Sequence, residues 1–365
     1  MLKDSARFFL GANSRYGFIS RFDSLCRGLD GWYIFILKGG PGTGKSSLMR
    51  RVGEAVAANG QEVICIQCGS DPKSLDGVVF PELKAAIVDG TAPHSLEAKY
   101  PGAAQEMINL GEFWDKRGIF AHRREIIALS EENSSLHADA ARFISAAGLI
   151  SANIRKLARP SVDRKKLGAF VTRLAAREFG RKPASGEGRA FAAFLSGITP
   201  DGVVACNDTM NRLCGRVIEI HDDFGAAGNL LLQALLSAAL AAGHDVISCY
   251  CPMDPKEKLE HLIIPGLSLG FFTSNRWHKA GLPVEKRVSV TRFTDMPALR
   301  THKNTVSFYH RAVREMLNEA VMLMDDARRC HDRLERIYME HMNFDRVDQV
   351  ADQLVERVLE RQWQG

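Results

Sequence analysis

The sequence has little net charge and few aromatic residues. Its 48 Lys and Arg residues nearly balance 43 Asp and Glu residues, and the net charge of +5 is not concentrated in a basic run. Aromatic residues make up 8% of the chain and are not interleaved with basic ones. Basic surfaces with aromatic rings are typical of nucleic-acid-binding proteins, so the composition gives no clear sign of such a surface. The charge balance is compatible with acidic ligands such as nucleotides.

The chain also lacks an apolar leader and a clear membrane span. Its first residues, MLKDSARFFLGANSRYG, contain no apolar stretch of the length that a signal peptide needs. Residues 224–242 are nearly all apolar, and a membrane-spanning helix needs roughly 20 such residues. This segment has no flanking Lys or Arg anchors, and an internal repeat assigns it to a soluble core. We therefore interpret it as a buried helix and expect a cytoplasmic protein.

The eight cysteines do not have the spacing of a disulfide scaffold. Cys65 and Cys68 form a Cys-x-x-Cys pair, and Cys249 and Cys251 occupy the matching place in the second half. Four thiolates could bind a zinc ion if the two pairs met in space. Because both pairs lie in apolar, strand-like runs, we favour small buried residues of a reduced protein over a metal or redox site.

An internal repeat organises the chain, whose 365 residues are enough for two or three domains. NGQEVICIQCGSDPK, ending at Lys73, matches AGHDVISCYCPMDPK, ending at Lys256, at an offset of 183 residues. The match continues after one inserted residue. The paired residues include Gly60 with Gly243, Val63 with Val246, Asp71 with Asp254, Pro81 with Pro265 and His94 with His278.

Each repeat ends in a helical tail. Apolar residues recur at helical spacing from about residue 123 to 179, with a break near Pro160, and from about 306 to 359, with a break near Asn343. Asp163 and Asp345 occupy matching turn positions, each followed by an arginine. We predict two α/β units, residues 1–185 and 186–365, each a parallel-sheet core followed by a helical hairpin. The Pro/Gly/Ser-rich residues 181–188 are expected to join them.

A glycine-rich motif lies between a predicted strand and a predicted helix in the first unit. Residues 32–37 are apolar, aromatic and β-branched, which is typical of a buried parallel strand. The following GGPGTGKS, from Gly39 to Ser46, satisfies G-x-x-x-x-G-K-[ST]. A helix is expected to begin near Gly44 and to end at Asn59 and Gly60. An accidental glycine-rich turn would lack this strand-and-helix context.

The motif predicts binding of a nucleoside triphosphate, ATP in the first instance, with magnesium. Backbone N–H groups approach a phosphate closely where side chains are absent, and the helix N-terminus adds its unpaired N–H groups. Lys45 is expected to contact the β- and γ-phosphates, and the Ser46 hydroxyl to coordinate Mg²⁺. The predicted nucleotide-binding residues are Gly39, Gly40, Pro41, Gly42, Thr43, Gly44, Lys45, Ser46 and Ser47.

Magnesium also needs a carboxylate ligand, usually an Asp at the end of a neighbouring strand. Asp89 is the preferred candidate, because the apolar residues 85–88 form a short predicted strand that ends on it. Asp71, after the predicted strand of residues 63–67, is the alternative. An Asp-Pro in both repeats favours a turn role for Asp71.

The residue that activates water is less clearly marked. Asp89 is followed by Gly90, so the catalytic glutamate often found beside this Asp in ATPases is missing. Glu82 and His94 are the candidates that could orient the attacking water. A structural role for His94 is the alternative, favoured by its match to His278.

The equivalent loop of the second unit lacks the essential groups. HDDFGAAGNLLL replaces KGGPGTGKSSLM, which puts Gly228 at the position of Lys45 and Asn229 at that of Ser46. Asp222 and Asp223 are expected to repel phosphate. We therefore predict a single active site, in the N-terminal half, with Arg276 as a candidate for a residue supplied in trans.

Three stretches of the first unit resemble a known family. ILKGGPGTGKSSLMRRVGE, CGSDPKSLDGVVFPELKAAIVDGTAPH and YPGAAQEMINLGEFWD are similar to a group of bacterial duplicated P-loop ATPases of about this length. The resemblance covers essentially the whole chain. It implies two tandem P-loop NTPase-like units and ATP binding or hydrolysis, without defining a reaction. Many members of the group keep a second intact GKS loop, and this chain departs from them there.

These features favour an ATPase whose hydrolysis switches its own conformation or that of a protein partner. A small-molecule or nucleotide kinase is the first alternative, because the same loop serves phosphoryl transfer to a small-molecule acceptor. A module that binds ATP without turnover is the second. The lack of an Arg-rich lid to hold a second phosphorylated substrate weighs against the kinase.

Overall fold

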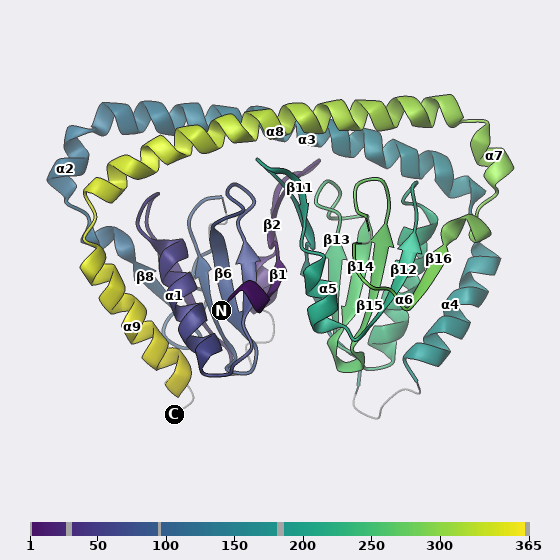
Figure 1. Ribbon diagram of the computed structural model, residues 1–365, viewed down its shortest axis with the longest axis horizontal. Helices are drawn as coiled ribbons and strands as arrows, with labels where there is room; N and C mark the ends of the chain where they lie inside the picture. The colour runs from purple at the N-terminus through teal and green to yellow at the C-terminus, as the bar shows by residue number, and fades with distance from the viewer. Residues whose placement is uncertain (1, 27–30, 94–95, 181–185, 280, 362–365) are drawn as a thin grey trace.

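Two six-stranded sheets form the cores of the molecule, one from each repeat (Figure 1). The computed structural model describes residues 2–26, 31–93, 96–180, 186–279 and 281–361. The first sheet, in the order β1-β5-β6-β7-β4-β8, contains β1 (Ala6–Phe8), β4 (Tyr33–Lys38), β5 (Ile64–Gln67), β6 (Leu75–Phe80), β7 (Ala85–Asp89) and β8 (Gln105–Asn109). The second, in the order β9-β13-β14-β15-β12-β16, contains β9 (Ala190–Ala193), β12 (Arg216–His221), β13 (Val246–Tyr250), β14 (Leu259–Ile264), β15 (Leu269–Ser274) and β16 (Lys286–Ser289).

The two sheets have the same topology. In each, one strand (β6 or β14) runs antiparallel to its neighbours, and every other adjacent pair is parallel. β4 lies between β7 and β8, and β12 lies between β15 and β16. Both strands occupy positions related by the 183-residue offset. The α/β class is therefore confirmed, and the shared topology is consistent with the internal repeat. The prediction of parallel sheets is wrong for one strand of each, because β6 and β14 run antiparallel to both neighbours.

The central strands are apolar because both of their faces are covered. In β4 every residue except Lys38 is buried. One face of this sheet packs against α1 (Lys45–Ala58). The opposite face shares a hydrophobic core with the second sheet, and this core contains Ile36 of the first sheet and Ile263 of the second. Smaller elements complete the cores: hairpins β2 (Gly11–Ser14)–β3 (Gly17–Ser20) and β10 (Ser196–Thr199)–β11 (Gly202–Ala205), helix α5 (Asp208–Leu213), and the 3-10 turns η1 (Leu2–Asp4), η2 (Phe22–Cys26), η3 (Leu110–Phe113), η5 (Pro265–Leu267) and η6 (Val290–Phe293).

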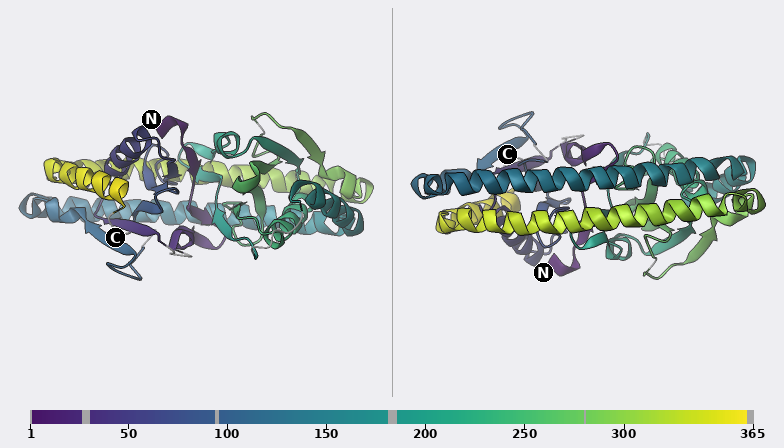
Figure 2. Two further views of the ribbon diagram at one scale, coloured as in Figure 1. Left: turned by 90° about the horizontal axis from the view of Figure 1, so that it is seen from below. Right: turned by 90° about the horizontal axis from the view of Figure 1, so that it is seen from above.

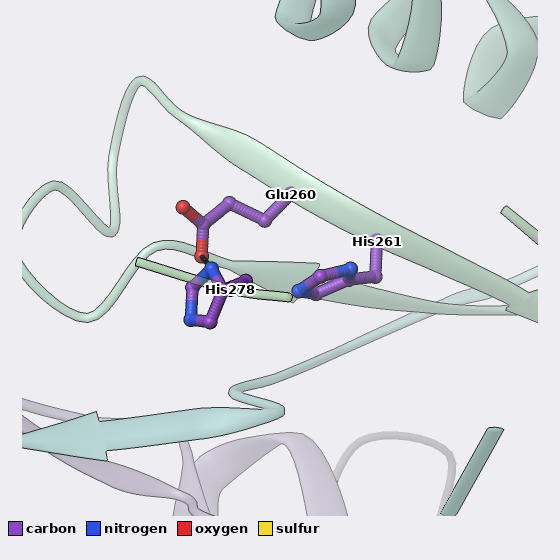
Figure 3. A group of neighbouring side chains, drawn as sticks. All are labelled: Glu260, His261 and His278. Carbon is purple, nitrogen blue, oxygen red and sulfur yellow. Dashed lines mark ion pairs between the residues drawn. The ribbon is translucent and has the colours of Figure 1, made fainter. Parts of the chain in front are cut away.

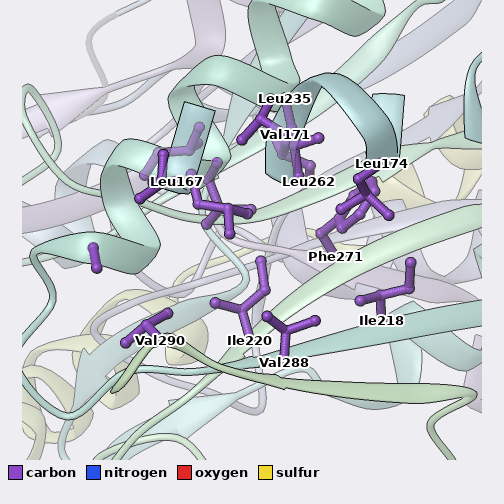
Figure 4. Close-up of a cluster of buried hydrophobic side chains, with 14 of the residues drawn as sticks. Leu167, Val171, Leu174, Ile218, Ile220, Leu235, Leu262, Phe271, Val288 and Val290 are labelled. Carbon is purple, nitrogen blue, oxygen red and sulfur yellow. The ribbon is translucent and has the colours of Figure 1, made fainter. Parts of the chain in front are cut away.

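The long apolar segment of the second repeat is helix α6 (Ala227–Ala241). It is apolar on most sides because its sheet covers one face and α4 (Arg164–Glu178) covers another. Figure 4 shows Leu235 of α6, Leu174 of α4 and Leu262 of the sheet in one cluster of buried side chains. The interpretation as a buried helix is confirmed. Within the described ranges, no helix is long and apolar enough to cross a membrane.

Two long helices run across both cores. α3 (Arg123–Ala158) and α8 (Lys303–Glu340) lie antiparallel and side by side. They lie above the two sheets in the view of Figure 1, and the right panel of Figure 2 shows the pair from above. Short helices α2 (Lys116–Ala121) and α7 (Met296–Arg300) lead into them. Their length carries each chain segment away from its own core.

The helical tails are therefore exchanged between the repeats. After α3, helix α4 packs on α6 of the second repeat, whereas α9 (Phe344–Glu360), after α8, packs on α1 of the first (Figure 1). Leu354 and Val358 of α9 lie in the first core with Val52 of α1. Full burial of one such side chain contributes about 1.5–3 kcal/mol. The predicted units 1–185 and 186–365 each hold one sheet. Their tails do not form the predicted helical hairpins, because α4 and α9 turn away from α3 and α8 and each completes the core of the other repeat (Figure 1).

The breaks between the tail helices are capped turns. Asp163 accepts a hydrogen bond from the backbone N–H of Lys166, and Asn343 accepts one from that of Arg346. Asn343, not Asp345, is thus the structural counterpart of Asp163, because Asp345 lies in the first turn of α9. The break near Pro160 is confirmed and contains the turn η4 (Arg159–Ser161). Of the predicted linker, residues 181–185 lie outside the described residues.

Candidate functional site

The glycine-rich loop joins β4 to the N-terminus of α1, as the motif requires. Gly39, Gly42 and Gly44 have φ values of 151°, 68° and 81°, which residues with a side chain rarely adopt. The Thr43 hydroxyl donates to the carbonyl oxygen of Gly40 at 2.9 Å and closes the loop. α1 ends at Ala58 and is followed by Asn59 and Gly60, as predicted.

Lys45 is held over this loop by its ammonium group. Its Nζ atom donates hydrogen bonds to the carbonyl oxygens of Gly39 at 2.8 Å and Gly40 at 2.9 Å. The same atom lies 3.6 Å from Oδ2 of Asp89. A phosphate entering the loop would compete for this cation, as expected of the motif lysine.

Asp89 lies where the sequence places it, at the end of the strand next to β4. It pairs with Leu37 in the parallel register of β7 and β4. Its Oδ1 atom accepts hydrogen bonds from the backbone N–H of Thr91 at 2.8 Å and the Thr91 hydroxyl at 2.6 Å. These bonds orient the carboxylate, leaving Oδ2 toward Lys45.

Asp71 has the turn role that the sequence favours. Its carboxylate accepts hydrogen bonds from the backbone N–H of Lys73 and from the hydroxyl of Ser74. It therefore shapes the connection between β5 and β6.

Ser46 connects the loop to β6. Its Oγ atom accepts a hydrogen bond at 3.0 Å from the backbone N–H of Leu75. The next residue, Asp76, is a buried acid that the sequence analysis missed. The signal for it was Glu260, an acid at the equivalent position of the second repeat, since β6 and β14 begin at Leu75 and Leu259.

The structure describes one of the two residues that were predicted to orient the attacking water. Glu82 lies in the turn between β6 and β7, at the end of β7 opposite Asp89. There its carboxylate faces the backbone N–H of Glu62 at 3.4 Å. The structure thus does not bring Glu82 to the loop, because the length of β7 separates them. His94 lies outside the described residues.

The second repeat's tail covers the first repeat's loop. A methyl group at Gly42 would lie 2.6 Å from the carbonyl oxygen of Glu335 in α8. One at Gly40 would lie 3.2 Å from the ring of Trp114, which packs against Tyr338 with ring centroids 5.3 Å apart. Sequence reasoning missed Glu335 and Tyr338, because nothing in the local pattern shows which core a long helix reaches.

The equivalent loop of the second repeat is filled by its own carboxylate. Asp222, at the position of Gly39, accepts hydrogen bonds from the backbone N–H groups of Phe224 at 3.0 Å, Gly225 at 2.9 Å and Gly228 at 2.7 Å. Burial raises the pKa of Asp222, while these three bonds oppose the rise. Repulsion was the expected effect of Asp222. In the structure the Asp222 carboxylate also occupies the loop N–H groups, a role that the sequence did not predict.

The second loop otherwise keeps the geometry of the first. Asn229, at the position of Ser46, accepts a hydrogen bond from the backbone N–H of Leu259 at 3.0 Å, matching the contact between Ser46 and Leu75. Arg276 lines a cavity beside Asp223 and Phe224 on its own repeat. It is therefore part of the second site's surroundings.

Glu260, His261 and His278 form a buried group in the second repeat (Figure 3). The Lys258 ammonium lies 2.6 Å from Oε1 of Glu260, and Oε2 of Glu260 lies 3.8 Å from Nδ1 of His278. Burial alone would raise the pKa of Glu260, but Lys258 and then His278 bring it down to about 2. Burial lowers the pKa of His261 to about 3.

These side chains, and not the cysteine pairs, include a group that could bind a metal ion. Glu260, His261 and His278 could hold a metal ion, since their ligand atoms lie within 4.8 Å of one another. Lys258 already supplies a cation to Glu260. This is the one such group among the described residues, and none of the four cysteines belongs to it. Burial raises the pKa of the Cys251 thiol to about 12, which keeps it neutral.

Comparisons with known proteins identify no relative. No family model matches the chain, and neither the curated proteins nor the solved structures give a significant match. The resemblance to duplicated P-loop ATPases therefore stays a prediction.

Proposed function

We propose that the protein binds ATP with Mg²⁺ at residues 39–46 and hydrolyses it, with P-loop NTPase-like chemistry. The observation that carries this proposal is the position of Lys45. Its ammonium group is held at the loop carbonyls of Gly39 and Gly40, with Asp89 at the adjacent strand end. A lysine beside a glycine-rich helix N-terminus suits the β- and γ-phosphates.

The residues present fit a magnesium ion. Mg²⁺ prefers hard oxygen ligands and is typically held by one or two protein groups plus phosphates and water. The Ser46 hydroxyl, in the first turn of α1, and the Asp89 carboxylate, 3.6 Å from the Lys45 ammonium, would supply such oxygens. When bound, the ion would neutralise charge that develops on the phosphates.

The loop's own groups then account for the binding and positioning. Its backbone N–H groups and Lys45 would hold the phosphates, with the γ-phosphorus accessible to water. In hydrolysis, the water oxygen bonds to the γ-phosphorus, the bond to the bridging oxygen breaks, and the water proton leaves with phosphate or solvent. Catalysis of this kind depends on positioning and charge.

The tail exchange supports a conformational switch. Glu335 and Tyr338 lie against the nucleotide loop, and their helix α8 continues across the molecule to the second core. A phosphate that moves Gly40 or Gly42 would therefore displace a helix shared by both repeats. The filled loop at Asp222 supports one nucleotide per chain.

The test is phosphate release from ATP by the purified protein. We expect Mg²⁺-dependent release that is lost in Lys45→Ala and retained in Lys165→Ala, an exposed lysine on α4. A metabolite mixture added in parallel distinguishes the kinase, which would yield a new phosphorylated product. Binding of ATP without either product would leave a binding module, and equal activity of both variants would contradict the proposal.

A further inference from the structure

A cavity of about 310 Å³ lies beside the filled loop of the second repeat. Its walls come from the loop itself, from α7 and from the first turns of α8. Apolar side chains form part of the lining, among them Phe224, Leu299 and Val306. The volume is at the lower end of the roughly 300–1,000 Å³ typical of small-molecule sites.

The polar part of the lining is strongly cationic. The cavity is lined by Arg276, Arg300, Lys303, Arg311 and Arg314, against a single acid, Asp223. Only Arg314 of these five forms an ion pair within the described ranges, with Glu315 at 3.6 Å on the exposed surface. Asp223 faces His221 at 3.6 Å. All five cations are exposed, so together they give the cavity mouth a positive potential that would attract an anion.

A buried histidine forms another part of the wall. His310 is only 8% exposed, and neither of its ring nitrogens has a hydrogen-bond partner among the described residues. A buried polar group without a partner costs about 1–3 kcal/mol. Because His310 lines the cavity, a ligand oxygen there could accept or donate the missing bond.

The first repeat keeps only one of these five cations, Arg123. His122 and His302 precede α3 and α8 with nearly identical backbone angles, which establishes the register of the two helices. In that register Glu131 replaces Arg311, and Phe120 replaces Arg300. The remaining counterparts are Ala92 for Arg276, Arg123 for Lys303, Ser130 for His310 and Ser134 for Arg314. Four of the five cations are therefore a property of the second repeat and not of the shared fold.

From this geometry we infer that the cavity binds a small organic phosphate. The arginines and Lys303 would contact the phosphate oxygens, since guanidinium groups bind phosphate through paired hydrogen bonds. Phe224, Leu299 and Val306 would contact the organic part. The site is distinct from the loop at Lys45 and does not depend on nucleotide binding there.

The inference is tested by calorimetric titration of the full-length Lys45→Ala protein, in which the first loop has lost its phosphate-binding cation. The probes are ribose 5-phosphate, 3-phosphoglycerate, AMP and inorganic phosphate. We expect at least one organic phosphate to bind more tightly than inorganic phosphate. The Arg311→Gln/Arg314→Gln double substitution should weaken it at least about tenfold, since each 1.4 kcal/mol corresponds to tenfold in affinity.

Two further variants separate this site from general charge effects. Arg164→Gln/Lys165→Gln removes the same charge from the exposed face of α4 and should change affinity less than about twofold. His310→Gln should remove the probe-dependent shift of one imidazole signal in the NMR spectrum. The inference is overturned if no organic phosphate binds, if inorganic phosphate binds equally well, or if both double variants behave alike. Because every titration uses the Lys45→Ala protein, the result does not depend on whether the first loop of the wild type binds ATP.

Discussion

The backbone of Glu335 in the second repeat lies against Gly42 of the first repeat's loop, so closely that a Cβ on Gly42 would be 2.6 Å from the Glu335 carbonyl oxygen. This contact joins the proposed nucleotide site to the long helix α8. It also makes Gly42 the position where the tail exchange can be tested most directly.

We expect Gly42→Ala to destabilise the protein more than Gly102→Ala. Both glycines have positive φ, 68° and 77°, so both substitutions incur a similar backbone cost. Only at Gly42 does the new methyl group meet a backbone atom, because nothing lies within 4 Å of the one at Gly102. Overpacking of this kind costs roughly 1–3 kcal/mol in addition. Equal losses in urea unfolding would show that the contact is not maintained in solution.

The two candidate acids should differ in their effect on magnesium-dependent ATP binding. Asp89→Asn should weaken it at least about tenfold, whereas Asp71→Asn should mainly lower stability, because Asp71 caps a turn. The measurement is a titration with a non-hydrolysable ATP analogue at several magnesium concentrations. The reverse ranking would assign the metal ligand to Asp71.

The filled second loop predicts one nucleotide per chain and a specific response to losing its anion. Asp222→Ala would leave three loop N–H groups without their acceptor, and a buried group in that state costs about 1–3 kcal/mol. We expect Asp222→Ala to have a lower Tm than the wild type. Added sulfate should raise the Tm of the variant more than that of the wild type, because the anion can accept the freed N–H hydrogen bonds. If titration shows two equivalents of the ATP analogue in the wild type, the second loop has been misread.

Acid should remove the stability that Glu260 provides. Its pKa is lowered from 4.5 to about 2 by Lys258 and His278 despite burial. A carboxyl group whose pKa is lower in the folded state stabilises the folded protein at pH values above its unfolded-state pKa. That contribution is lost as the pH falls from about 4.5 toward about 2.

Glu260→Gln should therefore be much less stable than the wild type at pH 7, by about 3–5 kcal/mol for a buried pair broken on one side. The difference should narrow below pH about 4.5. Replacing both partners, as Lys258→Met/Glu260→Gln, should recover much of the loss. A pH-independent difference in urea unfolding would argue against the ion pair.

Leu354→Ala and Leu174→Ala form a reciprocal test of the tail exchange. Leu354 in α9 packs with α1, so Leu354→Ala should speed amide hydrogen exchange in α1. Leu174 in α4 packs with α6, so Leu174→Ala should speed amide hydrogen exchange in α6. Each substitution is expected to cost about 2–5 kcal/mol. Faster exchange in the helix of the same repeat would show that the tails pack on their own cores in solution.

Local patterns in the sequence were enough to predict the elements around the first loop and the helical tails. The loop from Gly39 to Ser46 lies between a strand and a helix, because glycines, an apolar run and a helix stop act over a few residues. Asp89 was found for a similar reason, since a short apolar run ending on an acid places it at a strand end. The duplication was also visible, because two copies of one fold retain matching residues in register.

Only the tertiary structure decided how those elements combine. Periodicity predicted the helical tails but could not show that α9 covers α1, since an apolar face fits either core and the length of α8 determines which one it reaches. The direction of the Asp222 carboxylate depended on loop amides that fold around it. The cavity at His310 required Arg276 and α8, far apart in sequence, to meet. Short-range chemistry determined the elements and the first loop, whereas long-range packing determined the shared cores and the second site.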